Sequence, residues 1–293
     1  MRRTDQRIVS ESSRVIAKPY LPGGEARVRN VIDRVLALSE EHANHVLEQV
    51  IADFATRHKN IWQVFGRHFQ YVAPYLPEDA NLSEERRSLI GAYFTHEYSV
   101  QAAAFFNPSI VPHPNQSYLD DGSLRVILSF RSTGEGHISS IEFRSGVLGP
   151  DNALRFDPVS RFVETPEVIE NPTYNRSVFE LKLEDMESSN DVSMDVLGGL
   201  PGRFTRFDLE AQIQAVLDQS PEGRPLLHDT IEKIRWLARS NYELNFRADR
   251  RISEKVIFPV SDSESRGVED ARFVHFIGDD GEVTYYATYT AYN

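Results

Sequence analysis

The chain of 293 residues is long enough for one large domain or two smaller ones, and its 40% hydrophobic and 26% charged residues are typical of a folded, soluble protein. Lys and Arg number 32 against 44 Asp and Glu, and the resulting net charge of −12 argues against a nucleic-acid partner, which needs a basic face. The absence of cysteine excludes disulfides, zinc thiolate sites, iron–sulfur clusters and a cysteine nucleophile.

The sequence also lacks the signals of membrane insertion and secretion. No apolar run approaches the roughly 18 residues of a membrane-spanning helix. The basic start MRRTDQRIVSESS has no apolar segment of the kind found in a secretory signal. We therefore expect a cytoplasmic protein with no membrane partner. Nothing in the sequence excludes a homo-oligomer.

The first hundred residues follow the 3.6-residue apolar period of amphipathic helices. Four helices are predicted, each from one group of apolar residues: Val28 to Leu38, Val46 to Phe54, Ile61 to Val72, and Leu89 to Phe94. Ser39 and Ser83, each followed by two glutamates, predict the N-caps of the second and fourth helices. Residues 1–104 are therefore interpreted as a helical N-terminal extension.

From Phe106 onward the pattern changes to strands. Alternating or β-branched runs predict strands at 107–111, 124–131, 138–144, 256–260, 273–277 and 282–290. Residues 150–204 are rich in Pro, Asn, Asp, Ser and Gly, with a short regular stretch near 178–186. Apolar periodicity returns at 207–218 and 228–240, which predicts a helical insertion over about 205–242.

The strand region contains one internal echo. Asn107 begins a short strand that leads to Asp120-Asp121-Gly122 and a longer strand, and Asp270 begins a segment that leads to Asp279-Asp280-Gly281 and a longer strand. The echo indicates either successive sheets of a repeated β architecture or two unrelated hairpins. Among repeated architectures a propeller of four-stranded blades is the leading candidate, and 105–293 would hold blades 1 and 2 of about 40–50 residues each. A propeller needs more blades, so we expect the N-terminal part of a longer protein with an open sheet edge near 282–290.

Two charged segments are candidate sites. The segment RSTGEGHISSIEFR places Glu135 and His137 between two strands, with Arg131 at the end of the first strand; it is either an ordinary charged loop or part of a binding site. The segment ESRGVEDARF holds five formal charges, and its adjacent Glu269 and Asp270 would point to opposite faces of an extended chain. It is either a salt-bridged strand entry or a site where one carboxylate faces a channel and the other pairs with arginine. No motif indicates a metal site or an organic cofactor: His96-Glu97, for example, is followed by Val100 where a zinc-binding helix needs histidine.

Four segments together resemble glycoside hydrolase family 130. These are NPSIV at 107–111, LRVILSFR at 124–131, GVEDARF at 267–273 and YYATYTAY at 285–292. The stretches GAYFTHEYSVQAAAFFNPSIVPHPNQ, GEGHISSIEFR and RVIAKPYLPG further resemble the subgroup with a helical N-terminal extension. The resemblance implies a mixed α and β fold: a helical N-terminal region followed by the first blades of a five-bladed β-propeller, incomplete in this chain.

The resemblance also implies roles for single residues. Asp270 matches the aspartate of the family's G-(V/I)-E-D-P-R pattern, and the resemblance implies that this aspartate is the general acid. Arg272 matches the arginine of the same pattern. Ala271 stands where the family usually has proline. Asn107 and Arg131 match the residues that hold the mannose. Glu135 and His137 are subgroup features assigned to the sugar site, and Glu269 is placed behind Asp270.

The implied activity is inverting cleavage of β-mannosides without a cofactor. Hydrolysis of β-1,2-linked manno-oligosaccharides is favoured, with phosphorolysis by inorganic phosphate and a non-catalytic carbohydrate-binding or scaffold module as alternatives. The general base or the phosphate-binding residues would lie beyond residue 293, so we expect this chain alone to be inactive.

Overall fold

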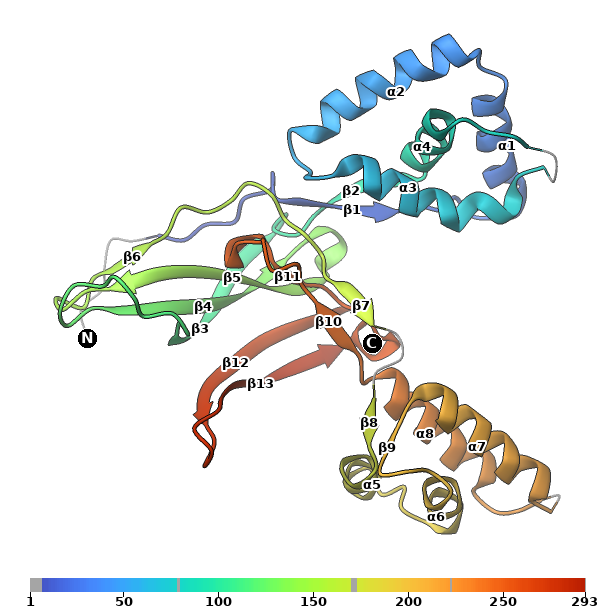
Figure 1. Cartoon of the computed structure of the whole chain (residues 1–293), viewed down its shortest axis with the longest axis vertical. Coiled ribbons are helices and arrows are strands. Elements are labelled where there is room, and N and C mark those ends of the chain that lie inside the picture. Colours follow the sequence, from blue (N-terminus) through green and yellow to red (C-terminus); the bar gives the residue numbers. More distant parts are fainter. Residues whose placement is uncertain (1–6, 78–79, 170–172, 222, 293) are drawn as a thin grey trace. The chain divides into compact units, whose positions relative to one another are not determined.

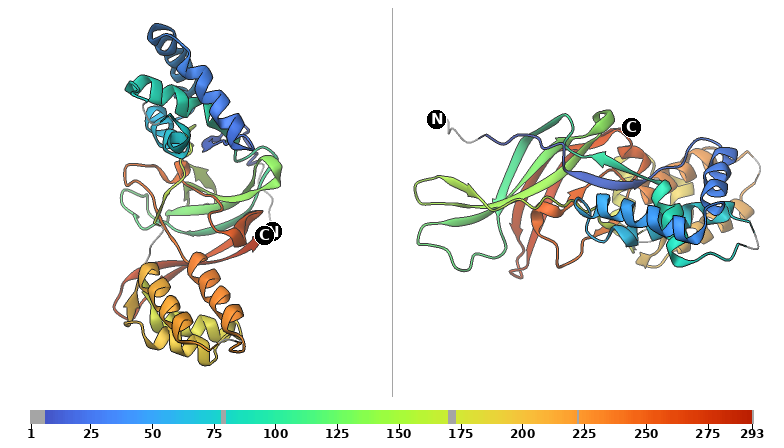
Figure 2. Two further views of the ribbon diagram at one scale, coloured as in Figure 1. Left: turned by 90° about the vertical axis from the view of Figure 1, so that its right-hand side faces the viewer. Right: turned by 90° about the horizontal axis from the view of Figure 1, so that it is seen from above.

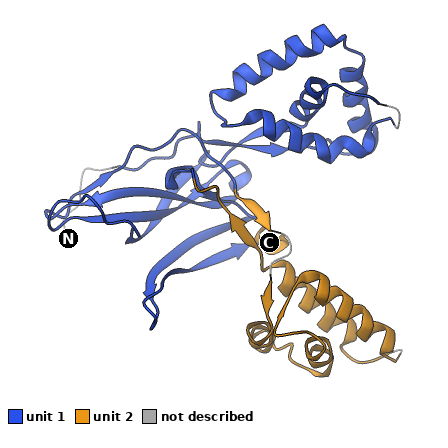
Figure 3. Cartoon of the chain, viewed as in Figure 1, with its two compact units in different colours: residues 1–165, 249–259, 266–292 blue, residues 166–248, 260–265, 293 orange. Residues whose placement is uncertain are grey.

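A computed structural model describes residues 7–77, 80–169, 173–221 and 223–292. The chain divides into two compact units, coloured separately in Figure 3. Unit 1 comprises residues 1–165, 249–259 and 266–292, and unit 2 comprises residues 166–248, 260–265 and 293. Among the described residues no helix has both the length and the apolar character needed to cross a membrane.

The four helices expected near the N-terminus are confirmed (Figure 1). They are α1 (Glu25–Leu36), α2 (Glu40–Ala55), α3 (Ile61–Val72) and α4 (Glu84–Tyr93). The Ser39 side chain accepts a hydrogen bond from the His42 N–H, and the Ser83 side chain accepts one from the Arg86 N–H, so both predicted N-caps are present. Apolar residues of all four helices form one core, with Phe65 and Ile90 fully buried in it.

Two short strands flank this helical region and were not expected from the sequence. They are β1 (Val15–Pro19) and β2 (Thr95–Ser99), which pair antiparallel with Val15 opposite Ser99. The two strands lie about eighty residues apart in the chain, and neither has the alternation of apolar residues from which a strand is predicted. The N-terminal region therefore contains a two-stranded antiparallel ribbon in addition to its helices.

The long strands of unit 1 belong to one seven-stranded sheet. The order β13-β12-β5-β4-β3 forms its main path, and β6 and β11 both pair with β5. The strands are β3 (Ala104–Pro112), β4 (Leu124–Thr133), β5 (Ser139–Leu148), β6 (Leu154–Phe156), β11 (Val256–Ile257), β12 (Gly267–Ile277) and β13 (Val283–Tyr292). Strand β13 lies at one end of this order, which confirms the expected open edge near 282–290.

This single sheet contradicts the predicted propeller. The two halves of the sequence echo do form the hairpins β3–β4 and β12–β13, but β12 also pairs in parallel with β5, with Gly267 opposite Ser139. The strands therefore do not separate into four-stranded blades. The physical reason lies at Gly267: a Cβ on this residue would lie 2.7 Å from the Ser139 backbone nitrogen, so only glycine lets β12 approach β5 so closely. Local turn and alternation signals predict hairpins but say nothing of this long-range pairing.

Unit 2 is a helical module with its own core (Figure 2). The helices α7 (Arg206–Gln219) and α8 (Leu227–Arg239) confirm the two predicted helices. Two further helices precede them: α5 (Arg176–Asp185), which coincides with the short regular stretch noted near 178–186, and α6 (Asp191–Gly198), which was not expected. Two-stranded ribbons complete the unit: β7 (Glu167–Ile169) with β10 (Glu243–Asn245), and β8 (Tyr174–Asn175) with β9 (Arg203–Phe204).

Candidate functional site

Two β-bulges in unit 1 hold Asn107 and Asp270, two of the candidate residues. The register of β3 against β4 shifts between Phe106 and Ser109, and that of β12 against β13 shifts between Glu269 and Arg272. Asn107 lies in the first bulge with φ 52°, and Asp270 lies in the second with φ 54°. Non-glycine residues seldom adopt this left-handed backbone, and Asn and Asp tolerate it best. Such conformations and bulges gather at functional sites, where they redirect a side chain.

Direct contacts join the two bulges. Asn107 Nδ2 donates a hydrogen bond to Asp270 Oδ1 at 2.7 Å. In the reverse direction, Arg272 Nη1 donates to the Asn107 carbonyl oxygen at 3.2 Å. The Phe273 N–H donates to Ser109 Oγ at 3.0 Å, one step further along both strands. Residues 163 positions apart in the chain are thereby fixed against one another.

Arg131 approaches this pair from β4. Its guanidinium forms an ion pair with the Glu269 carboxylate, and its Nη1 lies 3.7 Å from Asp270 Oδ1. Its Nε donates to Ser139 Oγ at 3.1 Å, and its Cζ lies 5.1 Å from the centre of the Phe106 ring. These contacts hold the guanidinium in one place from three sides.

The two carboxylates of the group differ in their surroundings. The Glu269 side chain is 13% exposed and forms an ion pair with Arg131, whereas the Asp270 side chain is 40% exposed. Asp270 therefore presents a reachable carboxyl group, and Glu269 serves to orient Arg131. One of the two acids was expected to pair with an arginine, and Glu269 pairs with Arg131.

The loop between β4 and β5 places the other two candidates differently. The Glu135 carboxylate accepts a hydrogen bond from the Ser99 N–H at 2.9 Å, and the Glu135 carbonyl accepts one from the Tyr98 hydroxyl at 2.7 Å. His137 is exposed and has a left-handed backbone with φ 62°. In the described part of the chain neither side chain contacts Asp270 or Asn107 in any hydrogen bond or ion pair. Both nevertheless flank the end of the hairpin that carries Arg131.

Three residues of this arrangement were not anticipated. Ser139 orients Arg131, Ser109 connects the two bulges, and the Phe106 ring supports the guanidinium. Phe106 and Ser109 lie within two residues of Asn107 in the sequence, and this closeness is the one feature from which their part in the site could have been predicted. Ser139 had none, because serines of this kind are common in strands and loops.

Comparisons with protein-family models, with curated proteins and with solved structures find no match for this chain. Within residues 7–77, 80–169, 173–221 and 223–292, no group of three or more His, Asp or Glu side chains is placed to hold a metal ion. The geometry itself thus describes the site: the amide of Asn107 and the accessible carboxyl of Asp270 lie in the two bulges, and the guanidinium groups of Arg131 and Arg272 lie beside them. Such a group can bind hydroxyl-rich molecules and exchange a proton with them.

Proposed function

We propose that Asp270, Asn107 and Arg131 form the sugar-binding and proton-donating part of a glycosidase site for β-linked mannosides. The hydrogen bond between two left-handed residues at facing bulges, with Arg131 beside it, is the observation that carries the proposal. These are the residues to which the resemblance with glycoside hydrolase family 130 assigns the acid and the sugar contacts. The proposed substrates are β-1,2-linked manno-oligosaccharides.

Each side chain has a chemical part in this proposal. Asn107 Nδ2 and the guanidinium of Arg131 supply N–H donors for the hydroxyl groups of a sugar. Asp270 supplies the proton that the leaving oxygen needs when the glycosidic bond breaks. Glu269 pairs with Arg131 and so acts as a positioning residue. Inverting hydrolysis also requires a base about 6.5–9.5 Å from the acid, on the other side of the sugar.

The charges of this group favour a sugar over a phosphate. Arg131 and Arg272 are balanced by Glu269 and Asp270, so the group carries no excess positive charge to attract an anion. Phosphorolysis would need further cationic side chains to hold the phosphate. We therefore propose hydrolysis, and comparison of products with and without inorganic phosphate tests the choice: mannose 1-phosphate among the products would contradict it.

Binding is the first test of the proposal. Isothermal titration with β-1,2-mannobiose should show binding that Asn107→Ala or Arg131→Ala weakens by about 10-fold or more, since each removes donors to the sugar. Asp270→Asn keeps the shape and the acceptor for Asn107, so it should retain binding. An unchanged affinity in both Asn107→Ala and Arg131→Ala would place the sugar elsewhere.

Turnover is the second test. In a preparation that cleaves β-1,2-mannobiose, Asp270→Asn should lower kcat by about 100- to 10,000-fold while leaving sugar affinity nearly unchanged, because a general acid acts in the chemical step. Near-normal kcat in that variant would reject Asp270 as the acid. Sugar binding without cleavage under every condition would favour a carbohydrate-binding module.

A further inference from the structure

The helices α5 and α6 of unit 2 have an apolar groove between them. The groove has a volume of about 480 Å³ and is lined by residues of both helices and by Ser189 in the segment that joins them. Its lining includes Leu183 and Leu197, which belong to the core of unit 2. It also includes Leu181 of α5 and Met194 of α6, which are 58% and 59% exposed. The groove therefore opens the core of this unit to the surface between two exposed apolar side chains.

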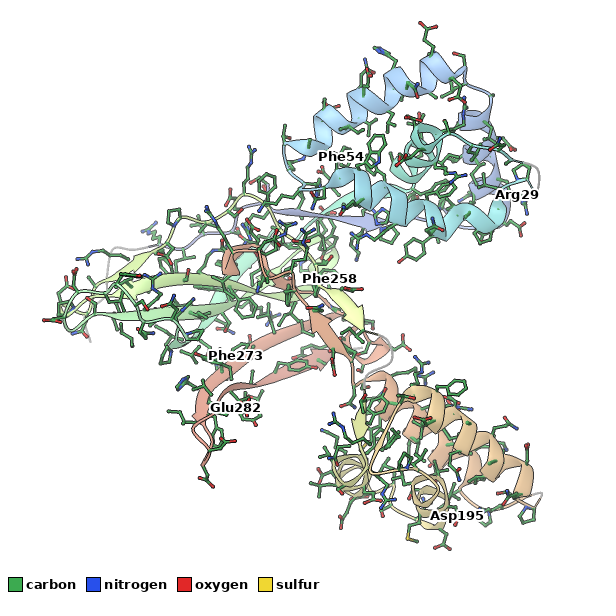
Figure 4. The ribbon with its side chains drawn as sticks, in the orientation of Figure 1. Arg29, Phe54, Asp195, Phe258, Phe273 and Glu282 are labelled. Atoms are coloured by element: carbon green, nitrogen blue, oxygen red, sulfur yellow. The ribbon has the colours of Figure 1, made fainter. Side chains whose placement is uncertain are left out.

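The two helices carry an excess of negative charge. Residues 176–198 contain six acidic and two basic side chains, which gives this segment a net charge of −4. Glu180 and Asp195, the latter labelled in Figure 4, form ion pairs with arginines of unit 2 at 3.4 and 2.8 Å. Glu184, which lines the groove, and the other three acids form no ion pair with any residue in the described part of the chain. Most of the negative charge of these helices is therefore not neutralised within the unit.

The apolar lining and the acidic charge together select the kind of partner. Negative charge repels nucleic acids, anionic lipid surfaces and acidic proteins. Apart from their ends, α5 and α6 bond their backbone groups internally, so the groove offers no edge that could extend a strand. A helix needs no such edge, because it satisfies its own backbone and presents apolar side chains at i, i+3, i+4 and i+7. Met194 suits such a partner, since its flexible thioether can adapt to side chains of different shape.

We propose that the groove between α5 and α6 binds a basic amphipathic helix of another protein. The apolar face of that helix enters the groove between Leu181 and Met194 and covers the core residues beneath them. Its Lys and Arg side chains lie on the flanks of this face and meet Glu184 and the neighbouring acids. Apolar burial supplies most of the affinity in this arrangement, and the charges select a basic partner over an acidic one. This binding surface belongs to unit 2 alone and is independent of the sugar site.

A synthetic peptide tests the apolar part of the proposal. The probe is a fluorescein-labelled helix of leucine and lysine, about 18 residues long, with all its leucines on one face. Fluorescence anisotropy should show saturable binding at micromolar concentration, and Leu181→Ser or Met194→Ser should each raise the dissociation constant by about 5-fold or more without changing the charge. Val178→Ser is the matched control and should have less than about a 2-fold effect, because Val178 is 51% exposed on α5 but lines a different pocket. Circular dichroism verifies that the variants are folded. No saturable binding up to about 100 µM peptide, or equal weakening by all three variants, would overturn the proposal.

A second comparison separates the groove from general attraction between a basic peptide and a chain of net charge −12. A peptide of the same composition in scrambled order keeps the charge but loses the apolar face, so it should bind about 10-fold more weakly. Glu184→Lys should raise the dissociation constant of the original peptide by about 5-fold, whereas Glu48→Lys should leave it within about 2-fold. Glu48 is exposed on α2 of unit 1, and its substitution changes the net charge by the same amount. Equal binding of the two peptides, or equal effects of the two lysine variants, would show attraction without a groove and overturn the proposal.

Discussion

The backbone at residue 270 offers a sensitive test of how the site is built. Asp270 has φ 54°, a conformation in which alanine costs roughly 1–2 kcal/mol more than glycine. In ordinary strand positions the order is reversed, and glycine is less stable than alanine by about 0.5–1 kcal/mol. We therefore predict that Asp270→Gly is more stable to unfolding than Asp270→Ala by about 1 kcal/mol.

The side chain adds a second contribution that both variants lose. The hydrogen bond from Asn107 ends on a carboxylate, and bonds to charged groups are worth roughly 1.5–3 kcal/mol. The lower end applies here because the Asp270 side chain is 40% exposed and solvent screens it. Asp270→Ala should thus cost about 2 kcal/mol and Asp270→Gly about 1 kcal/mol, whereas Asp270→Asn keeps the acceptor and should stay within about 0.5 kcal/mol of the original.

Guanidinium unfolding followed by tryptophan fluorescence can measure these differences. The chain has two tryptophans, Trp62 in unit 1 and Trp236 in unit 2, so a Trp236→Phe background leaves a reporter for the unit that holds the site. Ala271→Gly is the matched control: this neighbour is buried with an ordinary φ, and glycine there should lose about 1 kcal/mol. Equal or lower stability of Asp270→Gly relative to Asp270→Ala would refute the argument from backbone strain.

Three further predictions concern the framework around the site. A Cβ at Gly91 would lie 1.9 Å from a backbone oxygen of α3, so Gly91→Ala should lower the thermal unfolding temperature of unit 1. A Cβ at Gly66 would meet no neighbour, so Gly66→Ala should raise that temperature slightly. The opposite order of the two variants would show that α3 and α4 do not pack this closely. Burial lowers the pKa of His68 to about 4, so its neutral form favours folding above about pH 6.5, and that contribution, about 3 kcal/mol in full, is lost as the pH falls toward 4. His68→Gln should flatten the free energy of unfolding over this pH range, and an unchanged slope would contradict the assignment. Arg14 and Glu142 form a fully buried ion pair at 2.8 Å, so Glu142→Leu should lower the free energy of unfolding by about 3–5 kcal/mol in chemical denaturation. Adding Arg14→Met should recover a large part of the lost free energy. No recovery would mean that Arg14 is stabilised by its other contacts.

The helices show what local patterns can predict. Serine caps and apolar periodicity located α1 to α4, and periodicity located α7 and α8. The position of α5 was noted only as a short regular stretch, and α6 was not predicted, because both helices are short and lie in a region rich in turn residues. Their asparagine caps, Asn175 and Asn190, were visible in the sequence but resemble loop residues when read without their partners.

The arrangement of the strands depended on information that local patterns do not contain. The two DDG hairpins were recognisable, yet their union into one sheet rests on the contact of Gly267 with Ser139. The sequence likewise identified Asn107, Arg131, Asp270 and Arg272 through a resemblance, and the structure brings these four together. The left-handed conformations and the facing bulges could not be predicted, because they arise only when β3 and β12 lie against each other.

The central claim is that the two bulges form a sugar site. A ¹H–¹⁵N nuclear magnetic resonance titration of the chain with β-1,2-mannobiose tests it directly, since Asn107 Nδ2 and Arg131 Nε carry their own signals. The proposal predicts that these two signals and the Asp270 amide shift most, in a saturable manner, and that cellobiose produces much smaller shifts. Saturable shifts confined to other parts of the chain, or none with β-1,2-mannobiose, would contradict it.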